Sequence, residues 1–209
     1  MMSRRVLGIL FAAVALGAGL GVVRSAEGYP EPKIVQDTWQ MDVTYGEPKM
    51  ISVGLPGEQG KRLYGYITYT VTNRTGADQL FVPEFLVVTD AGDVIEGNRG
   101  VNPAVYRAIA ARERNPLMQE PASAVGRLLQ GKDQARDSVV IWEIPSHDVD
   151  EVRVYFAGLS GETHIVADPA GGEDKVLRKN LMLVYDTPGD ASHRSGVPYN
   201  LKSASWVVR

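Results

Sequence analysis

Polar and apolar residues alternate along much of the chain after residue 38, which is the pattern of half-buried β-strands. The clearest segment is residues 63–73 (LYGYITYTVTN), in which β-branched and aromatic residues dominate, as they do in strands. One face of this strand carries Leu63, Ile67, Tyr69 and Val71, while tyrosines and threonines lie on the other. We therefore expect a long strand with an apolar face, closed by a turn at residues 73–76 (NRTG).

The same kind of pattern recurs at close intervals. Further strands are expected at residues 39–45, 50–55, 79–89, 94–95, 152–156, 161–167 and 181–185, with a final strand or an irregular plug at 205–208. Pro83 indicates an edge position or a bulge, and residues 90–93 (DAGD) predict a hairpin turn. Residues 138–144 (SVVIWEI) are apolar on both faces, which favours a central position in a sheet. Eight or nine short strands predict an all-β fold, a sandwich rather than a barrel.

Residues 98–134 interrupt this pattern and predict a helical insertion. Asn102 followed by Pro103 is typical of a helix start, with the asparagine as N-cap. A helix is expected over residues 104–114, with Val105 and Ile109 facing inward. A second short helix is expected within residues 122–130, with an apolar side formed by Val125, Leu128 and Leu129.

The first 25 residues have the layout of a secretory signal peptide. Arg4 and Arg5 precede an uncharged apolar run, and small residues follow it. We expect cleavage after Ser25, although the run is also long enough to be weighed as an uncleaved anchor. Residues 26–38 then form an extended leader, and residues 39–209 form one domain. Localisation would be periplasmic or extracellular, with no membrane span after removal of the signal.

Composition narrows the classes of function. The chain has no cysteine, so disulfides, thiolate nucleophiles and cysteine-ligated metals are excluded. The net charge is −3 and the isoelectric point about 5.7. Loss of the signal would make the charge −6, because three arginines leave with it. An acidic chain has no overall positive field to attract nucleic acid, so we expect none as a partner.

Three segments carry a resemblance to a known class of domain. They are residues 69–76 (YTVTNRTG), 85–97 (FLVVTDAGDVIEG) and 128–156, in which a glycine-containing loop, a strand, a proline turn and an alternating strand follow one another. Together they resemble immunoglobulin-like β-sandwich domains of unknown function from bacterial secreted proteins. The resemblance implies an extracytoplasmic binding or scaffold module without catalytic residues of the family. The insertion at 98–134 departs from it.

Candidate chemistry is sparse. The histidines, His147, His164 and His193, are too far apart in sequence for a paired metal motif. No GxSxG motif marks a serine nucleophile. The acidic run around Asp90, Asp93, Glu96 and Asn98 allows a calcium site, but these residues are equally typical of a hairpin. We therefore predict no catalytic residues, no metal and no cofactor. Among the tryptophans, Trp142 is expected in the core, while Trp39 and Trp206 stay open as sugar-stacking residues.

The insertion is distinctive in charge. Residues 98–137 carry seven basic and four acidic side chains within an otherwise acidic chain. A solvated helix that caps one end of the sandwich would account for this. The alternative is a surface for an acidic partner, carried by Arg107, Arg112 and Arg114, since insertions on rigid scaffolds often carry function. The sequence thus predicts a non-enzymatic binding or assembly module with an unknown protein or cell-envelope partner. Carbohydrate binding, and then an unmarked hydrolase site, are the alternatives.

Overall fold

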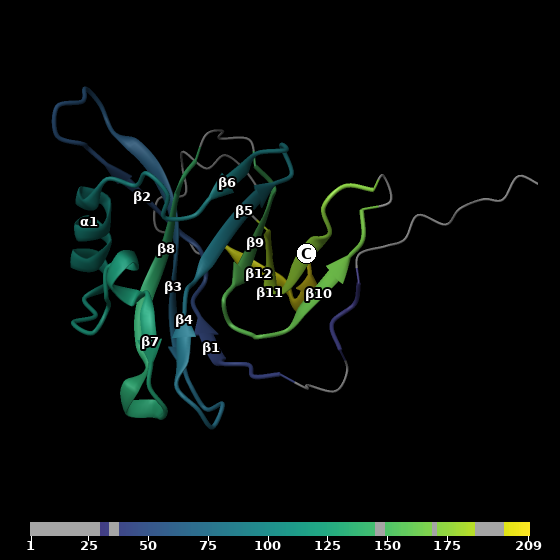
Figure 1. Ribbon diagram of the computed structural model, residues 1–209. Coiled ribbons are helices and arrows are strands. Elements are labelled where there is room, and N and C mark those ends of the chain that lie inside the picture. Colours follow the sequence, from purple (N-terminus) through teal and green to yellow (C-terminus); the bar gives the residue numbers. More distant parts are fainter. Residues whose placement is uncertain (1–29, 34–37, 145–148, 169–170, 187–198) are drawn as a thin grey trace, which may run out of the picture.

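The computed structural model describes residues 30–33, 38–144, 149–168, 171–186 and 199–209 (Figure 1). These residues form a mostly β protein with twelve strands, one α-helix and two short 3₁₀ turns. The all-β prediction is confirmed, with more strands than the eight or nine expected. The predicted signal peptide, His147 and His193 lie outside the described residues.

The first sheet is built around one long strand. β3 (Arg62–Thr72) pairs along one edge with β8 (Arg136–Glu143). Its other edge is shared by β2 (Lys49–Val53), which pairs with the first half of β3, and β1 (Asp42–Tyr45), which pairs with the second half. At the level of β1, this sheet is therefore three strands wide.

The second sheet is wider. Its order is β6 (Val94–Glu96), β5 (Glu84–Thr89), β9 (Glu151–Ala157), β11 (Lys175–Asp186) and β12 (Asn200–Val208), all antiparallel. β10 (Thr163–Val166) pairs with the first part of β11. The hairpin predicted at residues 90–93 is confirmed, because Thr89 N–H donates to the Asp93 carbonyl between β5 and β6. A separate ribbon pairs β4 (Gln79–Phe81) with β7 (Gly126–Leu128).

The two sheets enclose a common core. The predicted inward face of β3 is confirmed, since Ile67, Tyr69 and Val71 are buried there. Across from them, β9 contributes Val154 and Phe156, and the Tyr69 and Phe156 ring centroids are 5.0 Å apart, edge to face. Such aromatic pairs add to the hydrophobic stabilisation of the core.

The helical insertion covers the outer face of the first sheet. α1 (Pro103–Glu113) begins as predicted, with Asn102 Oδ1 accepting the Ala104 N–H at 2.9 Å. Val105 and Ile109 are fully buried and form a second core with Tyr64 and Tyr66 of β3 and with residues of β8. In Figure 1 the helix lies against the first sheet rather than at its end, so the expectation of an end cap is wrong. On the β3 face opposite the main core, Tyr64 and Tyr66 are buried because this helix covers them.

Two local predictions differ from the structure. The helix expected within residues 122–130 is a 3₁₀ turn, Pro121–Ala124, followed by strand β7, because pairing with β4 overrides a weak helical preference. Within residues 79–89 the chain leaves the strand at Val82 and Pro83, which separates β4 from β5.

β8 also differs from its predicted central position. It pairs with one strand, β3, and is buried on both faces because α1 covers one of them. Its other edge is closed by loop backbone: Asn98 N–H donates to the Ile141 carbonyl at 2.7 Å, and Gln119 N–H to the Asp137 carbonyl at 2.8 Å. Within the described part of the chain, no helix has the length and apolar character that a membrane span requires.

Candidate binding site

Just before β1, the chain is hydrogen-bonded to the connection between β9 and β10 of the second sheet. Met41 N–H donates to the Leu159 carbonyl at 2.8 Å, and Gly161 N–H donates to the Trp39 carbonyl at 3.0 Å. Gly161 allows this approach, because a Cβ there would collide with the Trp39 indole. In a strand the backbone groups of alternate residues point to the same side. Val43 and Tyr45 therefore direct their N–H and C=O groups outward, as Met41 does.

No described strand pairs with this outward edge. The residues that alternate with Val43 and Tyr45 direct their backbone groups toward β3. The Gly46 N–H, for example, donates to the Thr68 carbonyl at 2.9 Å. β1 has β3 on one side and, among the strands that the structure describes, none on the other. Val43 and Tyr45 have no backbone partner for these outward groups among the described residues, and such an edge can accept a further strand.

A groove of about 790 Å³ lies beside this edge. Its apolar lining comes from both sheets: Met41, Val43 and Tyr45 on the β1 side, and Leu181, Ala204 and Trp206 on the β11–β12 side. The groove exists because the second sheet extends by β12 beyond the strands that the first sheet places opposite it. Ala204 is exposed and Trp206 half-buried, so the inner face of β12 is partly open.

One end of the groove is positively charged. Arg74 and Lys132 both line it. Arg74 makes an ion pair with Asp42 at 3.1 Å, and both partners are largely exposed. No acidic partner of Lys132 is found among the described residues. An excess of one positive charge thus lies where β1 begins.

Trp206 is held in place by a buried ion pair. Lys179 Nζ lies 5.3 Å from the centroid of the Trp206 ring and 2.9 Å from Glu162 Oε2. Glu162 also accepts hydrogen bonds at Oε1 from the Lys33 N–H at 2.9 Å and pairs with His164 Nε2 at 3.0 Å. Burial of the Glu162 carboxyl would raise its pKa, but these hydrogen bonds and the charge of Lys179 outweigh it and lower the pKa to about 2. Glu162 is therefore ionised at neutral pH, with the His164 ring beside it.

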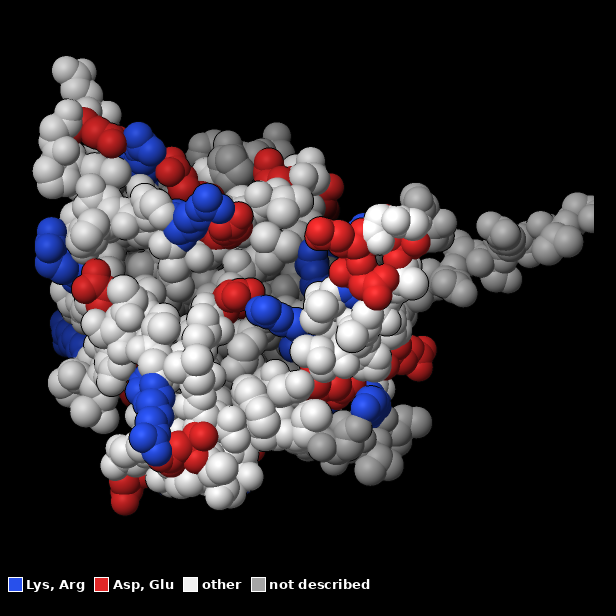
Figure 2. Space-filling view, viewed as in Figure 1, with Lys and Arg blue, Asp and Glu red and all other residues white. Residues whose placement is uncertain are grey.

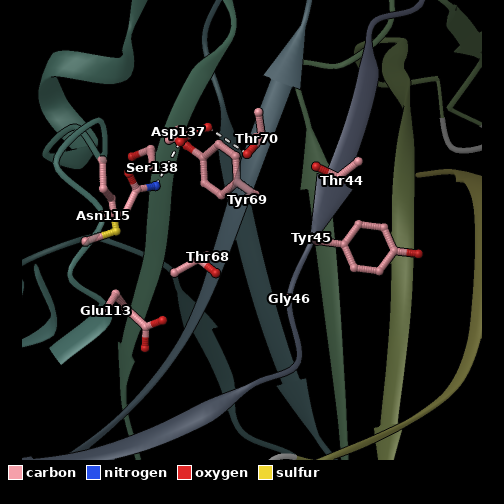
Figure 3. A pocket seen from close by; sticks show the side chains of 11 residues that line it. Thr44, Tyr45, Gly46, Thr68, Tyr69, Thr70, Glu113, Asn115, Asp137 and Ser138 are labelled. Atoms are coloured by element: carbon pink, nitrogen blue, oxygen red, sulfur yellow. Dashed lines mark hydrogen bonds between the residues drawn. The ribbon is translucent and has the colours of Figure 1, made fainter.

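A second, polar hollow lies on the outer face of the first sheet (Figure 3). It has a volume of about 190 Å³ and is lined by the hydroxyls of Thr44, Thr68 and Thr70 and by Glu113, Asn115 and Asp137. Asp137 accepts hydrogen bonds from Thr70 at 2.7 Å and from Asn115 at 2.8 Å, which are the dashed lines of Figure 3.

Glu113 at the same hollow is bound to Lys49 Nζ at 2.8 Å and to the Tyr66 hydroxyl at 2.6 Å. Burial would raise the Glu113 pKa, but the hydrogen bonds from Lys49 and Tyr66 prevail and lower it. Hydrolysis by paired carboxyls needs one partner with a raised pKa to donate a proton. The Glu113 carboxylate therefore suits hydrogen-bond acceptance better than acid catalysis.

The three arginines predicted as a partner surface do not share one role. Arg107 is exposed, and Figure 2 shows basic side chains on the outer surface over α1. Arg112 instead donates to the Met50 carbonyl of β2 at 2.7 Å, which joins the helix to the sheet. Arg114 is the C-cap in the left-handed conformation, with its N–H bonded to the Ala110 carbonyl at 3.1 Å. Arg107 and Arg114 stay predicted as contacts for a partner, whereas the Arg112 side chain bonds α1 to β2 within the protein.

The side chains weighed as calcium ligands are bonded to other groups of the protein. Asp93 Oδ2 accepts the Thr89 hydroxyl at 3.0 Å, and Asn98 Oδ1 accepts the Ile141 N–H at 2.8 Å. Glu96 is paired with Arg99. In the part of the chain that is described, no three histidine, aspartate or glutamate side chains gather closely enough to hold a metal ion.

The tryptophans follow the sequence expectation in part. Trp142 is buried in the main core, as predicted. Trp39 and Trp206 are half-buried and pack against that core, and Trp206 also lines the groove. The groove itself has no signal in the sequence, because it depends on which strands lie opposite one another.

Comparison of the chain with protein-family models, with curated proteins and with solved structures finds no match.

Proposed function

We propose that this chain is a non-catalytic binding module, outside the cytoplasm, that holds a segment of a protein partner in the groove beside β1. The observation that carries the proposal is the groove, because it combines an apolar floor with a strand edge that no described strand pairs with. Polypeptides present both backbone hydrogen-bonding groups and side chains, so such a surface can take an extended segment. An open apolar hollow of this kind on a soluble domain is typical of an interaction site.

The scaffold supports the same proposal. Two antiparallel sheets around a common core are compatible with an immunoglobulin-like sandwich, which we propose as the class of scaffold. Rigid sheets of this type commonly carry binding surfaces at their edges and loops. The signal expected at residues 1–25 supports a periplasmic or extracellular location.

The test is selection of peptides from a displayed random library on the exported protein, with affinities measured by calorimetry. Selected peptides should lose about tenfold or more in affinity on Trp206→Ala, because truncating a buried aromatic contact costs on the order of 2 kcal/mol. The matched control is Ile165→Ala, an exposed apolar residue of β10 that does not line the groove. Failure to enrich any peptide, or equal affinity in both variants, would contradict the proposal.

Carbohydrate binding is a second candidate, favoured by the polar hollow of Figure 3. Its threonine hydroxyls, carboxamide and carboxylates are groups that recognise sugar hydroxyls. A panel of monosaccharides should then bind the protein in calorimetry and fail to bind Asp137→Asn. Glu173→Gln, in an exposed loop, is the control. Absence of heat for the whole panel removes this candidate.

A further inference from the structure

We propose that the partner contributes one extended strand, which pairs with the outer edge of β1 and widens the first sheet over β12. This inference rests on the proposed function and specifies how the partner is held. The first sheet is three strands wide at β1, whereas the second sheet is five strands wide. β3 lies opposite β9, and the groove joins β1 to Leu181 of β11 and Trp206 of β12. A strand added beside β1 would therefore lie opposite β12, where the first sheet lacks one.

The backbone of β1 is prepared for this pairing. Val43 and Tyr45 present outward N–H and C=O groups, and the same edge is already paired one step earlier, where Met41 bonds Leu159. Neighbouring strands lie about 4.8 Å apart, while packed sheets lie about 10 Å apart. A strand at β1 therefore fits above the inner face of β12 and fills the groove. A strand on the outer edge of β12 would leave the groove empty.

The outer edge of β12 also has features that discourage pairing. β12 contains a register shift opposite Val184 and Tyr185, where Lys202 is the extra residue. The Lys202 ammonium pairs with Asp186 at 3.0 Å and with Glu151 at 3.1 Å, so the bulge rather than the lysine charge protects this edge. Bulges are a usual means by which sheet edges are protected from adding strands. β1 pairs with β3 without such a bulge. The two edges are thus unequal, and β1 is the one open to a partner.

The groove also specifies the sequence of the added strand. Its inward side chains would contact Trp206, Leu181 and Ala204, which favours valine, isoleucine or leucine at alternate positions. Its outward side chains would lie beside Thr44 and Asp42, which favours polar residues. Lys132, near the start of β1, favours an acidic residue at that end of the strand.

The first probe is a short end-blocked peptide with valine or isoleucine at alternate positions and threonine or glutamate between them. It should bind at least about tenfold more tightly than an isomer in which the apolar residues are contiguous, and binding should weaken as salt rises. Backbone N-methylation at each position in turn should reduce affinity strongly at every second residue and weakly between. Strand pairing predicts this period of two, because only alternate N–H groups face β1.

The second probe changes the protein. Val43→Pro removes one outward N–H of β1, and proline is tolerated on an edge strand when the lost N–H faces away from its neighbour. Ala204→Pro makes the same change on the outer edge of β12 and is the matched control. Val43→Pro should abolish binding of the alternating peptide with little change in melting temperature, and Ala204→Pro should leave binding within about twofold of the native protein.

The outcomes separate this inference from the proposed function. Loss of binding in Ala204→Pro with retention in Val43→Pro overturns it, and so does an N-methylation profile without a period of two. In either case library-selected peptides that still depend on Trp206 leave the proposed function standing. If Val43→Pro fails to fold, the N-methylation profile decides alone, because it leaves the protein unchanged.

Discussion

Glu162 accepts three hydrogen bonds in a site where its side chain is 1% exposed, and it is the counter-ion of buried Lys179. Glu162→Gln keeps the shape of the side chain and removes its charge. Lys179 would then be a buried ammonium without a partner. Breaking such a pair from one side costs about 3–5 kcal/mol, because the remaining charge stays desolvated. We expect the free energy of unfolding at pH 7 to fall by this amount.

The pH dependence follows from the lowered pKa. The Glu162 pKa is about 2 in the folded protein, against an ordinary value of 4.5. This difference corresponds to about 3 kcal/mol of stabilisation at neutral pH. A lowered pKa means that the unfolded chain takes up the proton first as pH falls. The stabilisation is therefore complete above about pH 5 and is lost progressively between about pH 4.5 and pH 2.

The assay is urea unfolding of the native protein and of Glu162→Gln at intervals from pH 7 to pH 2. The difference in unfolding free energy should be constant above about pH 5 and should shrink below it, because glutamine does not titrate. Glu173→Gln, in an exposed loop, should follow the native curve. A difference below about 1 kcal/mol at pH 7, or one that does not change with pH, refutes the reasoning.

Other substitutions test the two cores and the helix, each by urea or thermal unfolding. Ile109→Ala should cost about 2–5 kcal/mol, because it leaves a cavity between α1 and the first sheet; a cost below about 1 kcal/mol would show that the helix is not packed there. Val154→Ala in the main core should cost about 1–3 kcal/mol, whereas Arg153→Ala, one residue away on the exposed face, should stay within about 1 kcal/mol. Arg112→Ser should cost about 1 kcal/mol through its lost hydrogen bond to β2, and Arg107→Ser should stay within about 0.5 kcal/mol; equal melting temperatures for these two variants would contradict the distinction.

Most strands could be predicted from the sequence because their signal is local. The alternation in residues 63–73 marks β3 and assigns Ile67, Tyr69 and Val71 to the main core, where the structure has them. Asn102 and Pro103 likewise mark the start of α1, since the cap bond is made between residues two apart. Local patterns of this kind need no knowledge of the rest of the fold.

Errors arose where distant contacts decide the outcome. Residues 138–144 are apolar on both faces because a helix from the insertion covers one of them, and the sequence cannot distinguish this from a central strand. Residues 126–128 form a strand because β4 lies beside them. Glu162 and His164 lie on the same face two residues apart, so their contact has a local signal, whereas Lys179 reaches Glu162 through the pairing of β10 with β11.

The candidate site belongs to this second class, since no single segment contains it. Its floor comes from β11 and β12 and its rim from β1, which are separated by most of the chain. The fold closes the comparable edge of β8 with the backbone of Asn98 and Gln119, and it covers the outer face of the first sheet with α1. It gives β1 neither a lysine, a proline nor a bulge. Because an unprotected edge risks unwanted strand pairing, the contrast between the closed edge of β8 and the open edge of β1 favours a functional reason for the opening. That contrast between the edges of β8 and β1 is the strongest structural argument for a partner strand at β1.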